Sequence, residues 1–125
     1  MDLNILVVDD SAAIRKILIR ALQQTNLQIN QVYEASDGVE ALKVLKSSEV
    51  RLVLSDVNMP NMDGLQLLKE MHQIPNWKQV SVLMITTEGS QAKVLEAVEL
   101  GAKGYLRKPF TADQIKEKVL SCLGN

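Results

Sequence analysis

Short apolar runs alternate five times with longer stretches of helical periodicity, and this alternation restricts the fold more than any other feature of the chain. The clearest runs, at 4–8, 52–54 and 80–85, are almost entirely apolar, which is typical of strands covered on both faces. Two further strands are predicted at 28–35 and 104–107. Because strands and helices that alternate through short connections favour a parallel sheet between two helical layers, we predict an α/β fold.

The helices are predicted from apolar stripes and from the residues that begin or end them. Ser11 is the expected N-cap of the first helix, Asp63 begins the third, Gly101 ends the fourth, and 111–114 forms a capping box before the fifth. The side chains expected to face the sheet are Ile14, Ile17, Leu18, Ala21 and Leu22; Val39, Leu42 and Leu45; Leu65, Leu68 and Met71; Val94, Ala97 and Val98; and Ile115, Val119, Cys122 and Leu123. Arg15 and Lys16 fall off the first stripe and are expected on a solvated helix face.

Composition excludes several classes of protein. The formal net charge of −1 gives no strong attraction to nucleic acid or to an anionic membrane. No apolar run approaches the roughly 20 residues that span a bilayer, the first residues do not resemble a signal peptide, and the single cysteine cannot form an internal disulfide. We therefore expect one cytoplasmic domain over 1–125, monomeric, with no nucleic-acid or membrane partner.

Charged and hydroxyl side chains follow the predicted strands where each strand ends. Asp9 and Asp10 follow the first strand, Asp56 the third, Thr86 the fourth and Lys108 the fifth. The carboxyl ends of parallel strands meet at one edge of the sheet, where open α/β sheets bind ligands. Clustered carboxylates repel one another, and a Mg²⁺ ion, or Mn²⁺ in its place, would relieve that repulsion.

Each of these residues alone is more simply a helix cap or a turn residue. Together they suit a phosphoryl site, because a lysine and a hydroxyl complement a metal-bound phosphoryl group and a carboxylate can act as its nucleophile.

Five motifs carry a resemblance to a known family: Leu-Val-Val-Asp-Asp-Ser at 6–11, Ala-Ser-Asp-Gly-Val-Glu-Ala-Leu at 35–42, Ser-Asp-Val-Asn-Met-Pro-Asn-Met-Asp-Gly-Leu at 55–65, Met-Ile-Thr at 84–86 and Lys-Pro-Phe at 108–110. The whole chain resembles the receiver domain of two-component response regulators, and within it the stand-alone chemotaxis type. The resemblance implies a flavodoxin-like, doubly wound (βα)5 fold with strand order 2-1-3-4-5.

The resemblance also implies roles at the site. Asp56 takes a phosphoryl group from a phosphohistidine on a partner kinase, and Lys108, followed by a cis peptide bond, contacts that group. Mg²⁺ would be bound by the side chains of Asp10 and Asp56, by the backbone carbonyl of Asn58, and by Asp9 mainly through water. The chain would catalyse only its own phosphorylation and dephosphorylation.

The same resemblance implies what sets the lifetime of the phosphoryl group and which surface binds the downstream protein. Thr86 would move toward the phosphoryl group and Tyr105 would turn inward. Asn58 and Glu88 match the pattern of the chemotaxis type, in which the acyl phosphate is hydrolysed quickly. A flagellar switch or another effector would bind the face made by the fourth helix, fifth strand and fifth helix, through contacts such as Lys93, Tyr105 and Lys118.

Two departures from the chemotaxis pattern leave a non-flagellar phosphorelay as an alternative. Val57 replaces the usual aromatic residue after the phosphoacceptor, and 89–93 lacks the usual adjacent lysines. A phosphatase of the haloacid dehalogenase type would need an aspartate where Asn58 stands, and sustained turnover of phosphomonoesters would reveal it. A flavin carrier would need a hydroxyl- and glycine-rich first loop and would be yellow, and a pseudo-receiver would lack part of the acidic set.

Overall fold

The computed structural model describes residues 3–87 and 91–124. Its elements, in chain order, are β1 (Asn4–Val8), α1 (Ala12–Gln23), β2 (Gln31–Ala35), α2 (Gly38–Ser47), β3 (Leu52–Ser55), α3 (Gly64–His72), the 3-10 turn η1 (Pro75–Trp77), β4 (Ser81–Thr86), α4 (Gln91–Glu99), β5 (Gly104–Arg107) and α5 (Ala112–Cys122).

The strands form one parallel sheet in the order β2-β1-β3-β4-β5, which confirms the predicted topology. All residues of β3 and β4 are buried, as expected for central strands covered by helices on both faces. The chain order and the spatial order differ at β1, which lies between β2 and β3. This is where the direction of winding reverses, and ligand sites of such sheets lie beside that point.

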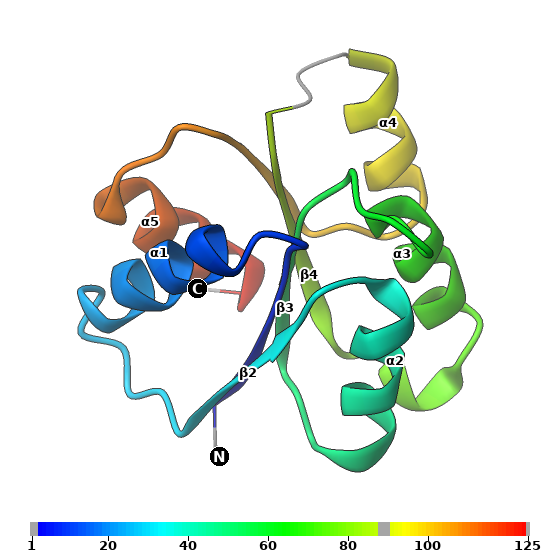
Figure 1. Ribbon diagram of the computed structural model, residues 1–125, viewed down its shortest axis with the longest axis horizontal. Coiled ribbons are helices and arrows are strands. Elements are labelled where there is room, and N and C mark those ends of the chain that lie inside the picture. Colours follow the sequence, from blue (N-terminus) through cyan, green and yellow to red (C-terminus); the bar gives the residue numbers. More distant parts are fainter. Residues whose placement is uncertain (1–2, 88–90, 125) are drawn as a thin grey trace.

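Helices α1 and α5 cover one face of the sheet, and α2, α3 and α4 cover the other (Figure 1). Two apolar cores result, because successive side chains of a strand point to opposite faces. Leu6 and Val8 of β1 belong to the core beneath α2 and α3, whereas Ile5 and Val7 belong to the core beneath α1 and α5. Each face of the sheet is therefore buried beneath its own layer of helices.

The predicted helix ends are largely confirmed. The Ser11 hydroxyl accepts a hydrogen bond from the Ile14 N–H, and Thr111 and Gln114 form the capping box at α5. Gly101 follows α4 with a φ of 104°, a left-handed conformation that favours glycine. No helix in the described part of the chain is long and apolar enough to cross a membrane.

Several predictions about the elements are wrong, among them the fourth strand, which spans Ser81–Thr86 rather than 80–85. The second strand begins at Gln31 rather than at residue 28. Ile17, Val39 and Val98 are exposed rather than packed on the sheet. In α2 the buried residues are Gly38, Ala41 and Leu45, so Leu45 of the predicted stripe is buried while Ala41 was missed. Leu42 is partly buried against the same core. Periodicity alone assigned too broad a buried stripe.

Candidate functional site

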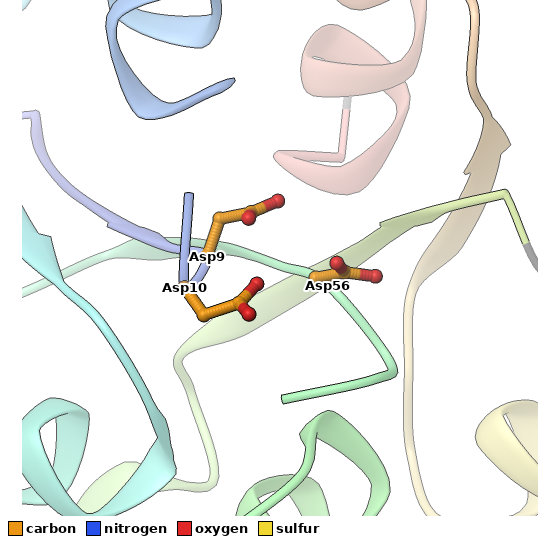
Figure 2. A group of neighbouring side chains, drawn as sticks. All are labelled: Asp9, Asp10 and Asp56. Carbon is orange, nitrogen blue, oxygen red and sulfur yellow. The ribbon is translucent and has the colours of Figure 1, made fainter. Parts of the chain in front are cut away.

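Three carboxylates lie together at the carboxyl edge of the sheet. Asp9 and Asp10 follow β1 and Asp56 follows β3, and one oxygen from each lies within 4.8 Å of the others (Figure 2). The register explains this proximity, because Val8 is paired with Ser55 and the two strands end side by side. The predicted convergence of these residues is confirmed.

Lys108 lies between two of the carboxylates. Its Nζ is 2.9 Å from Asp9 Oδ2 and 3.4 Å from Asp56 Oδ2. The side chains of Lys108, Asp9 and Asp56 are only 14%, 2% and 12% exposed, so the ion pairs are poorly screened by solvent. The lysine follows β5, where its backbone N–H donates to the Thr86 carbonyl at 2.9 Å, and the predicted cis bond to Pro109 is confirmed.

Backbone donors orient the Asp56 carboxylate. Its Oδ1 accepts a hydrogen bond of 2.7 Å from the Val57 N–H and a longer one of 3.4 Å from the Asn58 N–H. Its Oδ2 faces Lys108. The two oxygens therefore have different surroundings, one held by the backbone of the following loop and the other by a cation.

The Asp10 carboxylate is exposed and has no hydrogen-bond or ion-pair partner among residues 3–87 and 91–124. It lies near two other carboxylates without a counter-charge of its own. Oxygen ligands from carboxylates are those that Mg²⁺ prefers, and a hard cation would offset the repulsion. The donor set of Asp9, Asp10 and Asp56 thus fits a divalent metal ion.

The two predicted switch residues lie on neighbouring strands. Thr86 is the last residue of β4 and is fully buried, and Tyr105 is half-buried in β5, in register with Met84. Asn58 is exposed at the start of the loop after β3. Glu88, the other residue predicted to set the phosphate lifetime, lies outside the described residues.

Arg15 was wrongly expected on a solvated face. Its Nη1 donates to the Asp9 backbone carbonyl at 2.6 Å, and its Nε pairs with Glu34 Oε1 of β2 at 3.0 Å. Hydrogen bonds from Lys16 and then Arg15 hold the pKa of the Glu34 carboxyl below its ordinary value. Arg15 thus ties α1 and β2 to the turn that carries two carboxylates, a long-range contact that helical periodicity does not signal.

The sequence matches the response regulator receiver domain family over residues 5–120. The chain belongs to this family. A chemotaxis protein CheY homolog of Campylobacter jejuni is 40% identical over 123 residues, covering 98% of this chain and 93% of the relative. The chemotaxis protein CheY-3 of Vibrio cholerae is 41% identical over 118 residues, covering 94% and 89%.

Solved structures agree with this assignment. The chemotaxis response regulator CheY4 of Vibrio cholerae superposes with a TM-score of 0.88 at 34% identity, covering 98% of this chain and all of that one. A putative response regulator from Chloroflexus aurantiacus gives a TM-score of 0.90 at 29% identity, with both chains fully covered.

Family membership makes this receiver domain a phosphoacceptor protein of chemotaxis-type signalling rather than an enzyme with a substrate of its own. Receiver domains bind Mg²⁺ in an acidic pocket, and the cluster of Asp9, Asp10 and Asp56 can hold such an ion.

Proposed function

We propose that Asp56 is the phosphoacceptor of this receiver domain and that a histidine kinase supplies the phosphoryl group. The observation that carries the proposal is the position of Lys108, whose ammonium lies between Asp9 and Asp56 at the edge of the sheet. A cation there is placed to meet the negative charge of a phosphoryl group on Asp56.

The transfer is a displacement at phosphorus. The P–N bond of the donor phosphohistidine breaks while a P–O bond forms to an Asp56 carboxylate oxygen, and the departing imidazole nitrogen keeps the electron pair and takes up a proton. Asp56 Oδ1 stays bound by the Val57 N–H, which leaves the oxygen facing Lys108 as the nucleophile. Hydrolysis later returns the carboxylate and releases inorganic phosphate.

Mg²⁺ fits the same site. We propose that the side chains of Asp10 and Asp56 and the backbone carbonyl of Asn58 hold it, and that Asp9 contacts it mainly through water. When bound, the ion neutralises charge on the transferred group. Asp9 is already hydrogen-bonded to Lys108 and to the Ser11 N–H, so it serves mainly to hold the lysine in place.

The test is intact-mass measurement after incubation with acetyl phosphate and MgCl₂. One phosphoryl group per chain should be added, and none when EDTA removes the metal. A chain that gains no mass with Mg²⁺ present would exclude the proposal.

Mg²⁺ should stabilise the protein against heat. A ligand that binds only the folded state raises its stability by RT ln(1 + [L]/Kd), about 1.4 kcal/mol at ten times Kd. For a domain of this size that corresponds to a rise in Tm of about 5 °C. Thermal melts with and without MgCl₂ measure it. Asp10→Asn should lose most of the rise, and an equal rise in that variant would show that the ion binds elsewhere.

Thr86 and Tyr105 are proposed to transmit the signal. A phosphoryl group adds acceptor oxygens at the edge of the sheet, and Thr86, at the end of β4 beside β3, carries a hydroxyl that the metal does not require. If Thr86 moves toward the group, the loop after β4 follows and volume opens beneath Tyr105. A close-packed interior disfavours an empty space, so the ring should turn inward and reshape the face of α4, β5 and α5.

This coupling predicts a measurable loss in Thr86→Ala. Beryllofluoride, which mimics the phosphoryl group on the acceptor, should change amide hydrogen exchange across 91–107 in the wild type. Most of that change should disappear in Thr86→Ala and in Tyr105→Ala. The matched control is Thr87→Ala, an exposed neighbour that should respond like the wild type. A full response in both test variants would show that the signal leaves by another face.

The α4-β5-α5 face is proposed to bind the downstream protein, with Lys93, Tyr105 and Lys118 among its contacts. All three are half-buried, and Leu95 and Val98 add exposed apolar surface on α4. A partner must have different affinities for the two shapes of this face in order to read the switch. The chemotaxis names of the relatives favour a chemotaxis target, such as a flagellar switch.

A further inference from the structure

The loop after the phosphoacceptor, residues 57–63, is fastened to the start of α2 by two hydrogen bonds. The Gly38 N–H donates to the Met62 carbonyl at 2.9 Å, and Asn61 Nδ2 donates to Asp37 Oδ2 at 2.7 Å. Neither bond involves a residue of the proposed phosphoryl or metal site. We call the second one the Asp37–Asn61 latch.

The Asp37 carboxylate serves two segments at once. Its Oδ1 accepts the Glu40 N–H at 2.8 Å and caps α2, while its Oδ2 accepts Asn61. The side chain belongs to a buried residue, and these two donors, Glu40 first, hold the pKa of the Asp37 carboxyl below its ordinary value. Asp37 is therefore ionised at neutral pH, and the latch is a charge-assisted hydrogen bond, the stronger kind.

The contact leaves little freedom to the loop. Asn61 has a φ of 65°, a left-handed conformation that asparagine adopts more readily than most residues. A Cβ atom on Gly38 would lie 2.8 Å from the Met62 carbonyl oxygen, so the two segments abut through their backbones. The Gly64 N–H donates to the Val57 carbonyl at 2.9 Å and closes the loop at its base.

Asn58 lies between these two fixed ends. Its N–H faces Asp56 Oδ1 at 3.4 Å, and its carbonyl is the proposed backbone ligand of the metal. Because the base of the loop and residue 61 are both held, the path of the backbone at 58 depends on the latch. We propose that Asp37 is a positioning residue of the phosphoacceptor site, acting through Asn61 on the backbone of Asn58; this inference rests on the proposed function.

An exchange of the two partners tests the latch. In Asp37→Ser the hydroxyl still caps α2, since serine is a good N-cap, but the shorter side chain no longer offers a second acceptor to Asn61 Nδ2. Asn61→Gly deletes the latch while keeping a residue that accepts a positive φ, so this variant is expected to fold. The double variant Asp37→Asn/Asn61→Asp restores one donor and one acceptor and keeps the net charge of the wild type.

The readouts are the Mg²⁺ dissociation constant, by calorimetry with MgCl₂, and stability in urea. Asp37→Ser and Asn61→Gly should each weaken Mg²⁺ binding roughly tenfold, the lower end of the cost of removing an outer partner of a metal ligand. The exchanged double variant should recover most of that affinity. The control Asp63→Asn makes the same change of charge at another helix N-cap, on the same loop but without a bond to α2, and should bind Mg²⁺ nearly as well as the wild type.

Two results would overturn the latch. One is wild-type Mg²⁺ affinity in both Asp37→Ser and Asn61→Gly; the other is an exchanged variant that binds no better than Asp37→Ser while remaining fully folded in the urea assay. Failure of the proposed function looks different, because the wild type itself would then bind no Mg²⁺ and gain no phosphoryl group from acetyl phosphate.

Discussion

Asp56→Asn should remain folded and should lose the added phosphoryl group completely. An amide is not a nucleophile toward phosphorus, whereas its oxygen can still accept the Val57 N–H that now binds Asp56 Oδ1. The substitution also removes one of three clustered negative charges and leaves the ion pair between Lys108 and Asp9 in place. Mutual repulsion therefore falls, and stability in the absence of metal should not decrease.

Intact-mass measurement after incubation with acetyl phosphate and MgCl₂ tests whether Asp56 is the phosphoacceptor. The wild type should gain one phosphoryl group and Asp56→Asn none, while Asp63→Asn, the same chemical change at the other end of the loop, should gain one. An Asp56→Asn variant that is phosphorylated as fully as the wild type would assign the acceptor to another side chain. Peptide mapping of the adduct would then identify that residue.

Gly64→Ala should be among the most damaging single substitutions in the chain. A Cβ atom at this position would overlap the backbone oxygen of Asp56 and would lie 2.7 Å from the Met84 methyl group. The methyl group can move, but the carbonyl belongs to the residue that carries the proposed phosphoacceptor. Either α3 or the end of β3 must shift, and we expect a loss of about 3 kcal/mol or more, the upper range for overpacking.

Local conformation does not explain such a loss. Gly64 begins α3 and is not among the described glycines with positive φ, so alanine is compatible with its backbone. Alanine is also the better helix former, by about 1 kcal/mol in a helix interior. The predicted loss of stability therefore comes from the close approach of the added Cβ atom to the Asp56 backbone.

Urea unfolding of Gly64→Ala, with the phosphorylation assay beside it, measures both consequences. Gly104→Ala is the control, because its added Cβ would meet only side-chain atoms, Cys122 Sγ at 3.0 Å and Leu83 Cδ1 at 3.1 Å, which can adjust. Gly64→Ala should lose more stability than Gly104→Ala and should be phosphorylated more slowly. Equal stability of the two variants would mean that the backbone at Asp56 yields easily.

The sheet architecture and the residues that form the site follow from the sequence. Uniformly apolar runs identify buried parallel strands, and the first polar residue after each run must lie at the carboxyl edge. For this reason the positions of the predicted strand ends are enough to bring Asp9, Asp10, Asp56 and Lys108 together. The helix caps at Ser11 and Thr111 could also be predicted from the sequence, because capping depends on residues within one turn of the helix.

The side chains that hold the site in shape become apparent only from the folded structure. The bond from Arg15 to the Asp9 carbonyl and the latch between Asp37 and Asn61 join segments that are distant in sequence, and each partner alone has an ordinary local explanation as a surface cation, a helix cap or a turn residue. The exposure of Ile17 likewise depends on how α1 sits on the sheet. Periodicity and motif spacing predict local conformation and strand ends. These contacts depend instead on the distances between packed elements, and a local sequence pattern carries no information about those distances.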